Sequence, residues 1–160
     1  MTLSESGSAP LDLSFSLVNE TEAPPGIESD ELEALAAFVL AAEDAGGSWE
    51  VTVALVDDAR LQALHRDFMG IDTPTDIMTF PTDEADDESC GGELVISVDH
   101  ARMQAGAWGL SPEDEIRFLV THGLLHLLGW RDDTDELRKR MLERQQRLIN
   151  WWRSNPRDGA

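Results

Sequence analysis

The chain has 160 residues, of which 41% are hydrophobic, so its size suits a single domain with one core. Its 32 acidic and 12 basic residues give a formal net charge of −20, and a field of that sign opposes non-specific binding to nucleic acid. The single cysteine, Cys90, excludes an internal disulfide framework and a cysteine-based zinc finger. We interpret it as an incidental thiol in an acidic loop.

The first half of the sequence predicts strands and helices in alternation, after a disordered tail over 1–10. Apolar residues at every second position indicate a half-buried strand, and apolar residues three and four apart indicate the buried face of a helix. The predicted elements are a strand over 11–17, a helix from Ser29 or Asp30 to Gly46 and Gly47, a strand over 49–56, and a helix over 59–69.

The second half begins with two short apolar runs that we interpret as strands. The run over 77–80 is closed by Pro81 and suits an edge strand, whereas 92–97 has consecutive apolar residues and suits a strand buried on both faces. Three helices follow, over 99–107, from Ser111 to a stop near Gly129, and from 135 to about 152, before a flexible tail over 153–160. Residues 11–152 are therefore expected to form one domain.

Two histidines lie four residues apart in the helix that follows Ser111. His122 and His126 project from the same helix face and can bind one metal ion together, although the pair alone fits core histidines equally well. Gly129 permits a left-handed turn at the helix end, after which Asp132 can face the same ion, with Asp133 as the alternative. Three protein ligands with one position open to water are typical of a catalytic zinc site. We therefore predict one divalent metal ion, with zinc as the first choice.

The residue after the first histidine separates this pattern from that of zinc peptidases. In the HExxH motif this residue is the glutamate that acts as general base, and here it is Gly123. The helix thus has a metzincin-like ligand arrangement without the proteolytic base, which disfavours a peptidase. Lewis-acid activation of water still suits the hydrolysis of a phosphodiester.

The segment THGLLHLLGWRDD resembles the HGxLHLxGxxH signature of the YbeY family, the metal-dependent endoribonucleases of bacterial ribosomal RNA maturation. The segments over 74–81 and 92–97 resemble the family's PTDVLSFP and LGDIxIS segments, and the likeness spans residues 11–150. The resemblance implies an α+β fold in which a small mixed sheet of about four strands packs against helices. It also implies a metal site in a cleft and cleavage of single-stranded RNA, notably at the 3′ end of 16S rRNA.

The resemblance further implies partners and a location. Single-stranded rRNA and small-subunit ribosomal components are the expected partners, in late-stage ribosome quality control, and neither DNA nor a membrane is expected. The first ten residues lack the basic start and apolar run of a signal peptide, so we expect a cytoplasmic protein.

The sequence departs from the family at two positions. Asp132 replaces the family's third histidine ligand, which preserves ligation but lowers the net Lewis acidity of a bound ion. Met69 stands where the family carries an arginine in the cleft, a residue that would stabilise phosphate charge. Arg66, one helical turn away, is either its substitute or an ordinary solvated residue.

Several further residues are weaker candidates. Thr75, Asp76 and Ser97 resemble cleft positions of the family, and each also has an ordinary explanation in turn or strand-end hydrogen bonding. His65 stands where the family tends to have asparagine, and we interpret it as a surface or packing residue. Four tryptophans either stack on RNA bases or fill the core: Trp108, Trp130, Trp151 and Trp152.

Three functions compete at this point. The leading hypothesis is a metal-dependent endoribonuclease specific for single-stranded RNA. The first alternative is a zinc hydrolase of another substrate class, and the second is a non-catalytic ribosome-assembly factor in which zinc joins the last two helices.

Overall fold

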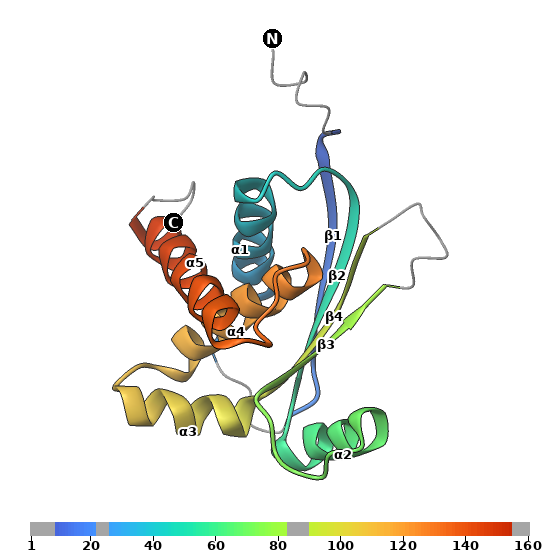
Figure 1. The fold of residues 1–160 in the computed structure, drawn as a ribbon, viewed down its shortest axis with the longest axis vertical. Coiled ribbons are helices and arrows are strands. Elements are labelled where there is room, and N and C mark those ends of the chain that lie inside the picture. The colour runs from blue at the N-terminus through green and yellow to red at the C-terminus, as the bar shows by residue number, and fades with distance from the viewer. Residues whose placement is uncertain (1–8, 22–25, 83–89, 155–160) are drawn as a thin grey trace.

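The computed structural model describes residues 9–21, 26–82 and 90–154 (Figure 1). Most of the predicted tails over 1–10 and 153–160 lies outside these residues. The elements are β1 (Leu11–Asn19), α1 (Ser29–Ala42), β2 (Gly47–Val56), α2 (Asp58–Met69), β3 (Ile77–Pro81), β4 (Cys90–Ser97), α3 (Val98–Trp108), α4 (Pro112–Leu127) and α5 (Asp135–Ser154).

The four strands form one mixed sheet in the order β1-β2-β4-β3. Strands β1, β2 and β4 are parallel neighbours, and β3 pairs antiparallel with β4 at the sheet edge (Figure 1). The α+β fold, the mixed sheet of four strands and the edge position predicted for β3 are therefore confirmed.

Helices cover both faces of this sheet. The larger core joins α1, α4 and α5 to the face that carries Val51, Val53 and Leu94. A smaller core joins α2 to the opposite face through Val56 and Val95. Since neighbouring strand residues point to opposite faces, β4 is buried on both sides, as its consecutive apolar residues predict.

Several element boundaries differ from the prediction, among them the end of β1 at Asn19, the start of β2 at Gly47 and three that follow. Helix α1 ends at Ala42 rather than near Gly46, because Asp44 already takes a left-handed conformation with φ 60° and turns the chain. Strand β4 begins at Cys90, which is exposed and pairs with Trp49 of β2, so this cysteine lies at a strand end and not in a loop. Helix α5 continues to Ser154, two residues into the predicted tail.

Among the described residues, no helix combines the length of a membrane span with the apolar character that such a span needs.

Candidate metal centre and cleft

The two histidines lie on helix α4, which runs through the middle of the molecule. Its start has the predicted signals, because Ser111 Oγ accepts a hydrogen bond from the backbone N–H of Asp114 at 3.1 Å and Pro112 occupies the first turn. The helix packs against the sheet and against α1, α3 and α5. On its partly exposed face the Nε2 atoms of His122 and His126 lie 3.2 Å apart.

The turn after α4 reverses the chain toward these histidines. Gly129 has φ 102°, its N–H donates to His126 O at 3.0 Å, and the N–H of Trp130 donates to Leu125 O at 2.9 Å. This pair of bonds is the Schellman arrangement that ends many helices at glycine. The indole N–H of Trp130 donates to Glu43 at the end of α1, at 2.9 Å, and this bond anchors the loop.

The reversed chain brings Asp132 to the histidine pair. Its Oδ2 atom lies 3.6 Å from His122 Nε2 and 3.3 Å from His126 Nε2. Asp133 lies outside the group, because its exposed carboxylate accepts a hydrogen bond from Arg131 at 2.6 Å, and this bond lowers the pKa of Asp133. Of the two candidate carboxylates, the structure therefore gathers Asp132 with the histidines.

The second nitrogen of each imidazole is held by a carbonyl oxygen. Nδ1 of His122 lies 2.9 Å from Oε1 of Gln145, and Nδ1 of His126 lies 3.1 Å from the backbone oxygen of Trp130. The amide of Gln145 is oriented by its own donation to Phe118 O at 3.1 Å. Because both carbonyls only accept, each neutral ring donates its proton from Nδ1, and each Nε2 lone pair faces the centre.

This arrangement fits a cation. Two Nε2 lone pairs and a carboxylate oxygen cannot hydrogen-bond with one another, since none of the three carries a proton when the imidazoles are neutral. Zinc–nitrogen bonds of about 2.0–2.1 Å place tetrahedral ligand atoms roughly 3.3–3.4 Å apart. The observed separations of 3.2, 3.3 and 3.6 Å are close to that spacing.

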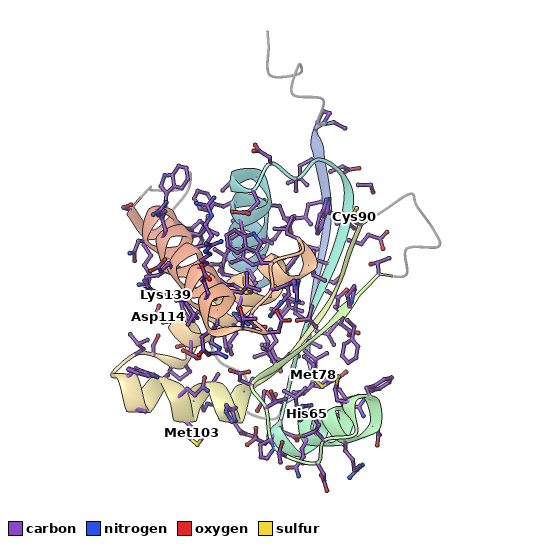
Figure 2. All side chains as sticks on the ribbon, viewed as in Figure 1. His65, Met78, Cys90, Met103, Asp114 and Lys139 are labelled. Atoms are coloured by element: carbon purple, nitrogen blue, oxygen red, sulfur yellow. The ribbon has the colours of Figure 1, made fainter. Side chains whose placement is uncertain are left out.

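The three side chains line an open cleft of about 530 Å³. Thr75 and Asp76, both predicted as cleft residues, lie in its wall, as do Met69 and His65. The Nδ1 atom of His65 lies 2.9 Å from Thr73 O, and Figure 2 shows this residue on α2 near Met78 of β3. His65 is therefore a cleft residue as well as a packing residue.

Two other predicted candidates lie elsewhere. Arg66 is exposed and pairs with Asp67 on its own helix at 3.3 Å, as an ordinary solvated residue would. Ser97 is buried at the start of α3, where its Oγ accepts from the N–H of His100 and donates to Asp58 at 2.5 Å. Neither side chain lines the cleft.

Sequence reasoning missed Gln145. This residue is 1% exposed and occupies the buried face of α5 with Met141, Leu148 and Ile149. A glutamine within an otherwise apolar stripe was the available signal, because a buried amide needs partners. Its partner could not be read from the sequence, since it depends on how α5 packs against α4.

Replacement of Gln145 by methionine is expected to weaken metal binding by about 10- to 100-fold, because the Nδ1 proton of His122 loses its acceptor. Gln145→Glu keeps an acceptor oxygen at this position and is expected to retain most of the affinity. Competition with a chromophoric chelator measures both values. Equal losses in the two variants would contradict this role and indicate a packing effect alone.

Close packing explains the glycine between His122 and His126 of the candidate metal centre. A Cβ atom at Gly123 would lie 2.7 Å from Leu94 Cδ2 and 3.1 Å from Ile77 Cδ1. A side chain here would point into the core toward β3 and β4. The structure thus leaves no room for the glutamate of a zinc peptidase at this position.

The variant Gly123→Leu is therefore expected to lower the free energy of unfolding by about 1–3 kcal/mol through overpacking. Gly106→Leu in α3 is the matched control, because no atom lies within 4 Å of a Cβ built there. Urea denaturation of both variants measures the difference. If Gly123→Leu proved as stable as its control, the close approach of α4 to the sheet would be wrong.

Comparison with known proteins agrees with this geometry. The model of the family described as endoribonuclease YbeY matches residues 17–153. The chain belongs to this family. Endoribonuclease YbeY of Bacillus licheniformis is 34% identical over 150 residues, which cover 88% of this chain and 95% of the relative. That of Geobacillus kaustophilus is 32% identical over 149 residues, which cover 87% and 96% of the two chains.

A solved structure shows the same fold. The solution structure of a Thermotoga maritima protein aligns with a TM-score of 0.56 and 26% identity, covering 91% of this chain and 96% of that protein. The YbeY resemblance predicted from the HGxLHLxG segment is therefore confirmed, and the matched region includes every residue of the candidate metal centre.

Proposed function

We propose that this chain is an endoribonuclease whose cleft holds one divalent metal ion on His122, His126 and Asp132, with zinc as the first choice. Three ligand atoms within 4.8 Å of one another at an open cleft carry the metal part of this proposal. Membership of the YbeY family makes the chain a hydrolase of RNA phosphodiester bonds.

The residues of the chain have separate tasks in this reaction. A bound zinc ion would supply Lewis-acid activation of water and of the phosphodiester. Gln145 and the carbonyl of Trp130 hold the Nδ1 protons, so that both Nε2 atoms stay available as ligands. The cleft of about 530 Å³ is the size of a small-ligand site and is large enough to take an unpaired nucleotide.

The substrate proposal is narrower. We propose that the substrate is single-stranded rRNA, with the 3′ end of 16S rRNA as the specific case. Cleavage would take place in the cytoplasm, in contact with small-subunit components, during late-stage ribosome quality control. This part rests on the family resemblance. The net charge of −20 supports recognition at a defined site, since it opposes general attraction to RNA and DNA.

Two structural observations count against the alternatives. A peptidase needs a general base that Gly123 cannot supply. A zinc site that only joined two helices would be closed by a fourth protein ligand, whereas these three side chains line an open cleft.

Within the described part of the chain, no arginine or lysine lines the cleft. Met69→Arg is expected to raise kcat/KM for single-stranded RNA by about 10-fold, because a guanidinium at this position would stabilise phosphate charge. Phe68→Arg is the control, since it adds the same charge one residue away, at a position that does not line the cleft. Equal rates for the two variants would show that position 69 does not reach the phosphate.

A single assay tests the proposed function. Metal-loaded wild-type and His126→Ala proteins are incubated with single-stranded RNA, duplex RNA and an unstructured protein. We expect only wild type to cut, and only single-stranded RNA. Equal cleavage of RNA by both proteins, or none by either, would contradict the proposal.

A further inference from the structure

A second pocket lies beside the metal cleft, and we call it the side pocket. Its volume is about 590 Å³, and it shares His122 and Asp76 with the cleft. Helices α3, α4 and α5 supply most of the remaining wall, including Trp108 and Glu115. A pocket of this size that continues from a reaction site is where a neighbouring part of the same substrate can lie.

Glu115 is a buried acid in the wall of the side pocket. It is 7% exposed, and no hydrogen bond from the described residues reaches its carboxyl group. Burial, and then the charge of Asp76, raise the pKa of Glu115 to about 7. Its oxygens still face solvent in the pocket, because among the described residues only Nδ1 of His100 is a fully buried side-chain atom without a hydrogen bond. The position of Glu115 therefore suits a ligand that brings hydrogen-bond donors into the pocket.

Trp108 provides a flat apolar surface at the same pocket. It is the last residue of α3 and is 76% exposed, the largest exposed fraction among the exposed large hydrophobic residues of the described chain. Leu110 and Leu142, also exposed, line the pocket with it. The other predicted stacking residues are engaged elsewhere: Trp130 with Glu43, Trp151 with Phe38, and Trp152 at 4% exposure in the core.

The charges around the pocket favour a neutral group over a phosphate. Asp76, Asp114 and Glu115 all line it, and together they repel anions. Among the described residues, Arg153 is the one arginine or lysine of the wall, and it is paired with Asp114 at 3.2 Å. The amides of Gln104 and Gln146 add both donors and acceptors. These groups match the edge of a nucleobase and not the backbone of RNA.

We propose that the side pocket binds one unpaired nucleobase of the RNA strand next to the cleaved phosphodiester, with Trp108 stacked on the base and Glu115 bonded to its amino group. Glu115 precedes His122 by two helical turns, about 10 Å along α4, which places the base near the reacting phosphate. Adenine, cytosine and guanine carry an exocyclic amino group and uracil does not, so the pocket favours the first three over uracil. This inference rests on the proposed function, because it takes RNA as the substrate.

Binding without cleavage tests the inference directly. Fluorescence anisotropy measures the affinity of the uncut hexanucleotides A6, C6 and U6 for the His126→Ala protein. We expect A6 and C6 to bind about 10-fold more tightly than U6. Adding Trp108→Ala is expected to weaken all three by about 10-fold, whereas Trp108→Phe retains the stacking surface and most of the affinity. Glu115→Leu is expected to remove the preference for A6 and C6. Glu115→Gln is the milder variant and is expected to reduce this preference.

The outcomes separate this inference from the proposed function. Trp151→Ala serves as the control, because this exposed tryptophan does not line the side pocket. If wild type cuts RNA but Trp108→Ala binds all hexanucleotides as Trp151→Ala does, the inference is overturned and the function stands. If wild type cuts no RNA yet base-dependent binding persists, the function fails and the side pocket remains a nucleobase site. Equal binding of A6, C6 and U6 would overturn the amino-group preference.

Discussion

Replacement of Asp132 by alanine is expected to lower metal occupancy at micromolar protein and to reduce RNA cleavage by at least about 100-fold. The carboxylate supplies one of the three proposed ligand atoms, and its Oδ2 lies 3.3 Å and 3.6 Å from the two Nε2 atoms. Its loss leaves two imidazoles from a single helix, which bind an ion more weakly than three ligands do. Elemental analysis after dialysis measures occupancy, and a labelled single-stranded RNA measures activity.

Asp133→Ala is the matched control for this prediction. It removes the same charge one residue away, but the carboxylate of Asp133 is bonded to Arg131 at 2.6 Å and takes no part in the ligand group. We expect about one metal ion per chain and unchanged cleavage. Metal loss from Asp133→Ala with full retention by Asp132→Ala would show that the loop presents the other carboxylate.

Asp132→His tests the departure of this chain from the family's third histidine. A neutral imidazole at position 132 preserves the ligand count and removes one negative charge from the ion, which raises its Lewis acidity. We expect this variant to retain zinc and to cut RNA at least as fast as wild type. Zinc retention with cleavage as low as that of Asp132→Ala would mean that the carboxylate has a task beyond ligation.

The local part of the metal centre was predictable because it depends on residues close in sequence. The spacing of His122 and His126 fixes their common helix face, and the turn at Gly129 has the left-handed φ that glycine permits. The sequence favoured Asp132 and left Asp133 as the alternative, and the structure places Asp132 with the histidines, an outcome that depends on the direction in which the loop leaves that turn.

The contributions from distant segments were not predictable in the same way. Gln145 meets His122 only because α5 packs against α4, and Glu115 faces Asp76 only because the segment before β3 passes the same end of α4. Gln145 interrupts the apolar face of α5, which is visible in the sequence as a conflict, whereas Glu115 lies in the first turn of α4, where an acidic residue is expected. The sequence shows that Gln145 needs a partner and does not show which one.

Replacement of Glu115 by glutamine is expected to stabilise the fold increasingly as the pH rises. Because the pKa of Glu115 is raised from 4.5 to about 7, the folded protein binds more protons than the unfolded chain between these pH values. The free energy of unfolding of wild type therefore falls as the pH rises through this window. Above the window this group causes no further fall. The full shift sets an upper limit of about 3 kcal/mol, and water that reaches the carboxyl group from the pocket lowers the effect below this limit.

Urea denaturation of the metal-free proteins between pH 4 and pH 8 measures this effect as the difference between Glu115→Gln and wild type. Any cost of burying the amide adds the same amount to this difference at every pH. The titration of Glu115 is therefore measured only by the change of the difference with pH. Asp76→Asn removes the second cause of the raised pKa and is expected to narrow the window, although Asp114, His122 and Arg153 still line the same pocket. A difference that did not change with pH would show that Glu115 titrates alike in the folded and unfolded chains. Growth of the difference with pH would instead show that the fold keeps, beside its metal centre, a carboxyl group that destabilises it at neutral pH, as expected for a group retained to bind a ligand.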